Sequence, residues 1–96
     1  SDLNSKVPVD IMPNNIQSIL SGTGDNEGVI QYTRQQDLIE ENAIVFTSGA
    51  GGLFKSGIPI GKIFKDSSNN KTLVSFFSDF SQLRYIKIIS FKEETE

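Results

Sequence analysis

The 96-residue sequence contains no cysteine, no histidine and no tryptophan. Without cysteine and histidine the chain cannot build a zinc site from thiolate or imidazole ligands. A Ser-His-Asp or Cys-His catalytic site is excluded as well, because its general base is missing. Two common kinds of metal and catalytic site are therefore ruled out within this chain.

Long apolar runs and an excess of basic charge are also missing. No apolar run approaches the roughly 20 residues of a membrane span, and no signal peptide is present. Nine Lys and Arg against twelve Asp and Glu give a net charge of −3. Because nucleic-acid phosphates need a basic face, we expect no nucleic acid as partner. The chain begins Ser1-Asp2 rather than with Met, so we expect a fragment whose membrane anchor would lie upstream.

What the sequence does contain is a series of short β-like segments separated by turn residues. The segment 7–12, VPVDIM, alternates apolar with other residues and is rich in Val and Ile, as a pleated strand requires. Asn, Ser, Asp and Pro at 13–15 and 66–70 indicate turns. We expect 35–42 to be a connection and 78–83 a turn or short helical segment. The expected strands are 7–12, 16–20, 29–32, 43–47, 60–65, 71–77 and 84–91.

Six or seven short strands without a long helix predict an all-β domain, a small and mainly antiparallel β-barrel. Closure into a barrel also removes the unpaired sheet edges that such β-branched strands would expose. We expect one barrel over 5–91, with frayed termini at 1–4 and 92–96; two small lobes are the alternative. The predicted core residues are Val7, Val9, Ile11, Ile30, Val45, Ile60, Ile63, Val74, Ile86 and Ile88.

The most informative segment is 44–63, which reads IVFTSGAGGLFKSGIPIGKI. Glycine reaches positive φ without a steric cost, so we expect each glycine here to mark a sharp change of chain direction. A phosphate cradle is the functional alternative, but it would need a following helix or a nearby basic residue. Thr47 and Ser48 could be read as a nucleophile, yet only a Lys could serve as base.

The same segment resembles the rod-shape-determining family MreC, whose members carry V-V-T-S-G-L-G-G-[IV]-F-P-x-G-[LI]-P-[IV]-G-x-V. Three flanking stretches are also similar to the family: SKVPV at 5–9, ILSGTGD at 19–25 and DFSQL at 79–83. The resemblance thus covers about residues 5–91. The sequence departs from the family pattern at four positions, which concern loop geometry: Asn42, Ala50, Lys55 and Phe76.

The resemblance implies two small extracytoplasmic β-barrels behind a helical stalk and a membrane anchor, one of them similar to half of a trypsin-like protease in fold only. It implies a non-enzymatic scaffold of the bacterial cell-wall elongation machinery, which maintains cell shape from the periplasmic side of the inner membrane. The implied partners are further copies of the chain in a dimer or higher oligomer, penicillin-binding proteins and MreD. We expect no cofactor and no metal. A hydrolase on a trypsin-like barrel and a small-ligand-binding barrel are the alternatives.

For partner binding we expect strand edges and loop tips rather than a deep pocket. A large apolar side chain at a loop tip either anchors a partner or plugs the end of the barrel. Phe54 is predicted as such an anchor, with plugging as the alternative. The predicted interaction residues are Gly49, Gly51, Gly52, Leu53, Phe54, Phe77 and Phe80.

Overall fold

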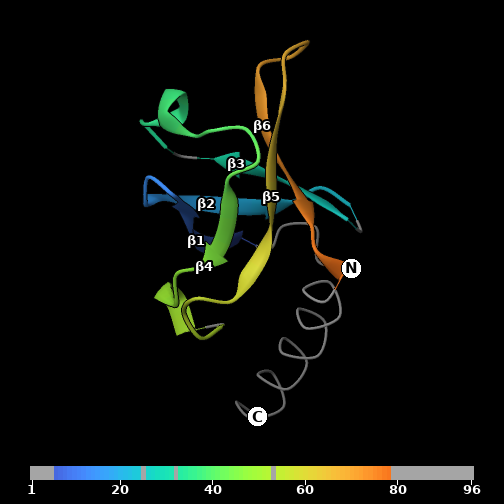
Figure 1. The fold of residues 1–96 in the computed structure, drawn as a ribbon. Helices are drawn as coiled ribbons and strands as arrows, with labels where there is room; N and C mark the ends of the chain where they lie inside the picture. The colour runs from blue at the N-terminus through green and yellow to red at the C-terminus, as the bar shows by residue number, and fades with distance from the viewer. Residues whose placement is uncertain (1–5, 25, 32, 53, 79–96) are drawn as a thin grey trace.

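A computed structural model describes residues 6–24, 26–31, 33–52 and 54–78. Within these ranges the chain forms six strands and two short 3₁₀ turns, η1 and η2 (Figure 1). The strands are β1 (Lys6–Met12), β2 (Ile16–Gly22), β3 (Glu27–Gln31), β4 (Ile44–Thr47), β5 (Pro59–Asp66) and β6 (Lys71–Phe76). The turns are η1 (Gln36–Leu38) and η2 (Ala50–Gly52).

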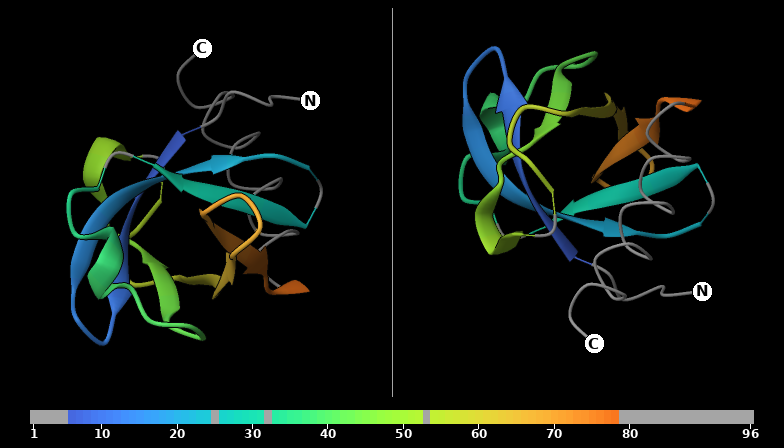
Figure 2. Two further views of the ribbon diagram at one scale, coloured as in Figure 1. Left: turned by 90° about the horizontal axis from the view of Figure 1, so that it is seen from above. Right: turned by 90° about the horizontal axis from the view of Figure 1, so that it is seen from below.

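The six strands close into a barrel in the order β1-β2-β3-β6-β5-β4. Figure 2 shows this ring from above and from below. The ring is completed by an antiparallel pairing of β1 with β4, in which Val9 lies opposite Thr47 and Met12 opposite Ile44. The predicted antiparallel β-barrel is thereby confirmed. The further strand expected at 84–91 lies outside the described residues.

Alternating side chains fill the barrel. In β1, Val7, Val9 and Ile11 are buried while Lys6 and Met12 are exposed. Every predicted core residue that the structure describes is buried, and Ile86 and Ile88 lie outside the described residues. Six further apolar residues join this core: Ile16, Leu20, Ile39, Ala43, Phe54 and Phe76.

The two connections that flank β4 lie at opposite ends of the barrel (Figure 1). Before β4, the segment containing η1 places Ile39 in the core with 1% of its surface exposed. This segment is held by the side chains of Gln36, which donates to Thr72 Oγ1 at 2.8 Å, and of Asn14, which donates to the Leu38 carbonyl at 2.8 Å. The predicted connection at 35–42 therefore also contributes a side chain, Ile39, to the barrel core.

Two glycines in strands permit close packing rather than a turn. A Cβ built on Gly28 would lie 2.6 Å from Leu20 Cδ1, and one built on Gly61 would overlap the Ser75 carbonyl oxygen. Gly61 lies in β5 opposite Phe76. The expectation that every glycine of 44–63 marks a change of direction is thus wrong for Gly61. A glycine is needed at this position because β5 and β6 approach each other too closely for any side chain.

Three asparagines end tight turns with positive φ: Asn15 at 56°, Asn42 at 69° and Asn70 at 57°. Asn tolerates this left-handed conformation better than other side-chain-bearing residues. Asn42, one of the departures from the MreC pattern, therefore suits the turn that leads into β4.

Candidate interaction surface

The loop between β4 and β5 is organised around Thr47, which has 1% of its surface exposed. Its hydroxyl donates to the Lys55 carbonyl at 2.5 Å and accepts from the Ile58 N–H at 2.9 Å. Its own carbonyl accepts from the Gly57 N–H at 2.7 Å. Because the hydroxyl is buried and committed to these bonds, Thr47 is a structural residue that folds the loop back onto the barrel.

The glycines of this loop occupy the left-handed region that glycine favours. The φ values are 85° at Gly49, 82° at Gly51, 75° at Gly52 and 82° at Gly57. A Cβ on Gly49 would lie 3.0 Å from the Cβ of Ser56, whereas Gly52 has open space around it. These positions are the changes of direction that the sequence predicts.

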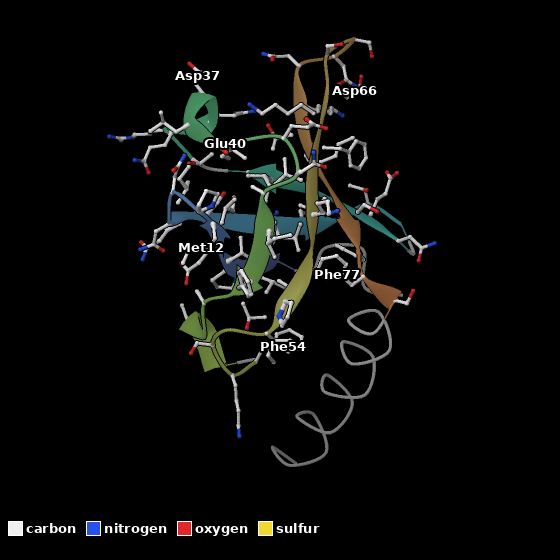
Figure 3. The ribbon with its side chains drawn as sticks, in the orientation of Figure 1. Met12, Asp37, Glu40, Phe54, Asp66 and Phe77 are labelled. Atoms are coloured by element: carbon white, nitrogen blue, oxygen red, sulfur yellow. The ribbon has the colours of Figure 1, made fainter. Side chains whose placement is uncertain are left out.

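Phe54 lies in the core with 7% of its surface exposed. The role of Phe54 as an interaction anchor stays a prediction; its burial places the ring in the barrel end below β4 and β5, where the Thr47 hydrogen bonds draw the loop back (Figure 3). This is the plugging alternative. Leu53 lies outside the described residues.

The two adjacent phenylalanines at the end of β6 point to opposite faces, as the pleat requires. Phe76 is buried, whereas Phe77 is half-buried and its N–H donates to the Ile60 carbonyl at 2.9 Å. Phe80 lies outside the described residues. An interaction role for Phe77 and for the exposed glycines Gly51 and Gly52 remains a prediction.

The sequence did not predict a second apolar surface, on the outside of β1, β2 and β4. We call it the apolar outer face, and it consists of Pro8, Met12, Ile19, Ile44 and Phe46. Met12 has 42% of its surface exposed, and the other four side chains are half-buried. Pro8 lies opposite Ile19, and Met12 opposite Ile44, in the strand ladders. The available signal was the unbroken apolar run Ala43–Phe46, which leaves no polar residue for the outside of β4.

Two grooves lie on this face. One, of about 400 Å³, lies between Met12 and Pro13 on one side and residues 40–44 and Phe46 on the other. The other, of about 320 Å³, lies between Pro8, Gln17 and Ile19 and the start of the glycine loop at Ser48 and Ala50.

Acidic groups border the larger groove. Glu40 and Glu41 belong to its lining, and the Glu41 carboxylate accepts from the Lys65 N–H at 3.0 Å. Asp10, in the middle of β1, lies opposite Gln17 on one side and Phe46 on the other. Its Oδ1 is buried and has no hydrogen-bond partner in the described part of the chain.

No cluster suited to a metal ion is found among the described residues. Asp37, Glu40 and Glu41 in particular form no such cluster. None of the helical segments that the structure describes combines the length and apolar character needed to cross a membrane.

Comparison with known proteins gives one consistent family. The sequence model described as "Rod shape-determining protein MreC, barrel core" matches residues 1–90. The chain is 33% identical over 93 residues to the cell shape-determining protein MreC of Caulobacter vibrioides, covering 97% of this chain and 27% of that protein. It is 31% identical over 96 residues to MreC of Haemophilus influenzae, covering 93% of this chain and 27% of that protein. The chain thus spans about a quarter of the length of these relatives.

Solved structures agree with the sequence comparison. The crystal structure of MreC from Pseudomonas aeruginosa superposes with a TM-score of 0.62 at 25% identity, over 76% of this chain and 50% of that one. A second structure, described as MreC, superposes with a TM-score of 0.61 at 20% identity, over 79% of this chain and 54% of that one.

Proposed function

The chain belongs to the MreC family of cell shape-determining proteins, and we propose that it is a non-enzymatic interaction module of the bacterial cell-wall elongation complex. The observation that carries the proposal is the match of the MreC barrel core to residues 1–90, together with the closed barrel seen in the structure. On this proposal the chain works by presenting its outer surface to other proteins.

The arrangement of polar groups supports a binding role over a catalytic one. The Thr47 hydroxyl, the first candidate nucleophile, is bonded to Lys55 and Ile58 inside the fold. The Ser48 hydroxyl accepts from the Ala50 N–H at 3.2 Å and so stabilises a turn. A nucleophile needs an activating base, and the chain has no histidine to provide one.

Location and partners follow from the same proposal. The module acts on the periplasmic side of the inner membrane, held there by an anchor elsewhere in the full protein. Its proposed partners are further copies of the chain, penicillin-binding proteins and MreD. The family resemblance supports these partners.

A segment exchange in Caulobacter vibrioides tests the proposal. The 93-residue matched region of its MreC is replaced by this chain in a strain whose own MreC can be depleted. We expect the chimera to maintain rod shape after depletion. Cells that become round while the chimera is present at the wild-type level would contradict the proposal. A chimera carrying Val45→Asp, which places a charge in the barrel core, is the negative control.

The hydrolase alternative has its own test. An active-site-directed fluorophosphonate should leave the purified chain unlabelled. Stoichiometric labelling of Ser48 would favour the hydrolase over the interaction module.

A further inference from the structure

We propose that the apolar outer face and Asp10 together bind a peptide segment of a partner protein in which a basic residue is flanked by apolar residues. This inference rests on the proposed function as an interaction module, and it adds the place of binding and the chemistry of the partner. The three features that carry it are the apolar grooves, the buried carboxylate oxygen between them, and the acids that border the larger groove.

The grooves supply the apolar part of the site. Pro8, Ile19, Ile44 and Phe46 are half-buried and Met12 is exposed, so the outside of three neighbouring strands presents apolar surface to solvent. The grooves lie at the two ends of β1, one beside Pro8 and one beside Met12. Asp10 is midway between these two residues and its side chain lies on the same face of the strand.

The Asp10 carboxylate supplies the specificity. A buried carboxylate oxygen without a donor carries a desolvation cost that a hydrogen bond normally offsets. Asp10 Oδ1 has no such donor in the described part of the chain. Its ladder neighbours, Gln17 and Phe46, provide no positive charge. The Asp10 side chain as a whole is only half-buried, so an incoming guanidinium or ammonium group can reach the carboxylate and form a charge-assisted hydrogen bond with it.

The surrounding charge favours the same partner. Glu40 and Glu41 line the larger groove, and none of the described residues that line either groove is Lys or Arg. Glu40 and Glu41 therefore attract a basic segment at this groove and repel an acidic one, while the exposed Lys62 lies outside its lining, opposite Ile44 in the β4–β5 ladder. The face thus fits a cationic and apolar segment rather than an acidic or neutral one.

A pair of synthetic peptides tests this directly. The probe is acetyl-Gly-Ser-Leu-Arg-Phe-Leu-Ser-Gly-amide, and its matched control replaces Arg by citrulline, which keeps the shape and removes the charge. Binding to the ¹⁵N-labelled chain is measured by amide chemical-shift changes. We expect the changes to lie in β1, β4 and residues 40–46. The Arg peptide should bind about tenfold more tightly than the citrulline peptide, as expected for one charge-assisted hydrogen bond.

Two variants separate Asp10 from general charge. Asp10→Asn should abolish the preference for Arg over citrulline. Its urea midpoint should be unchanged or higher, because the change removes the charge of a carboxylate whose buried oxygen Oδ1 has no hydrogen-bond donor in the described part of the chain. Asp66→Asn removes a carboxylate at the tip of the β5–β6 hairpin, away from Met12 in Figure 3, and should leave the preference intact. If the Asp10 carboxylate only stabilised the fold, Asp10→Asn would instead lower the urea midpoint.

Other outcomes overturn the inference. Equal binding of the two peptides, shifts confined to another face, or an unchanged preference in Asp10→Asn would each do so. If sedimentation shows a dimer that Met12→Glu dissociates, the face binds a second copy of the chain instead. The two proposals can fail separately. If the Caulobacter chimera keeps rod shape but Asp10→Asn leaves the peptide preference unchanged, the proposed function is supported and the binding site at Asp10 is rejected.

Discussion

Gly61 and the Ser75 carbonyl oxygen lie so close across the β5–β6 ladder that a Cβ on Gly61 would overlap the oxygen. The same Cβ would lie 2.9 Å from Val74 Cγ1. Since backbone and core meet at this point, neither neighbour can move without disturbing the barrel.

Gly61→Ala should therefore lower the free energy of unfolding by about 1–3 kcal/mol, the range typical of overpacking in a well-packed interior. Urea denaturation of the variant measures this change. Gly24→Ala is the matched control, because a Cβ there meets nothing within 4 Å. Equal stability of the two variants would show that β5 and β6 separate easily at Gly61.

Phe54→Ala should lower the free energy of unfolding by about 3–5 kcal/mol, because it empties the plug at one end of the barrel. Denaturant midpoint and sedimentation are measured on the same sample. Met12→Ala, at an exposed position, should change stability little. If Phe54→Ala were as stable as the wild type yet impaired in association, Phe54 would be an interface anchor after all.

Thr47→Val keeps the shape of the side chain and removes the hydroxyl that joins β4 to Lys55 and Ile58. The Ile58 N–H and the Lys55 carbonyl would lose their partner, at a cost of about 1–3 kcal/mol in unfolding free energy. Thr47→Ser retains the hydroxyl and should retain most of this stability. Amide exchange at Ile58 should become faster in the Val variant only.

The hairpin tip gives a prediction on pH. The Ser68 hydroxyl donates to Asp66 Oδ1 at 2.6 Å, and the Ser68 N–H donates to the same oxygen at 3.1 Å. These two hydrogen bonds, chiefly the one from the hydroxyl, hold the pKa of Asp66 below its ordinary value. A carboxyl whose pKa is lowered on folding stabilises the fold above its unfolded pKa, and this contribution is lost as pH falls through the folded pKa.

Asp66→Ala should therefore reduce stability at pH 7 and flatten the decline of stability on acidification. Carbon-detected NMR titration of the wild-type Asp66 carboxyl provides the direct measurement. A wild-type pKa at or above the ordinary aspartate value would contradict the hydrogen-bond pattern at Ser68.

Local patterns were sufficient to predict the strands and most of the core, because alternation along a strand records which side chains face inward. Val7, Val9 and Ile11 show this directly. The order of strands in the ring was not predictable in this way. The pairings of β1 with β4 and of β3 with β6 join residues far apart in the sequence, and alternation does not say which strands meet.

The environment of the interaction residues could not be predicted from the sequence for a different reason. Phe54 follows a run of glycines, which suggests a loop tip, but its burial depends on the Thr47 hydrogen bonds to Lys55 and Ile58. Those bonds exist only once the loop has folded back. The apolar outer face was missed for a related reason, since a strand that is apolar on both sides is usually read as fully buried.

Ring closure also governs how the molecule opens. In an open sheet an edge strand can detach by breaking one ladder, whereas each of the six described strands of this barrel is paired on both sides. Loss of any one of them breaks two ladders and leaves two neighbours unpaired. Amide protons in the middle of the strands should consequently exchange with solvent mainly through unfolding of the whole barrel, with a free energy close to the global one. The barrel would then pass abruptly between intact and unfolded, without a partly unzipped form.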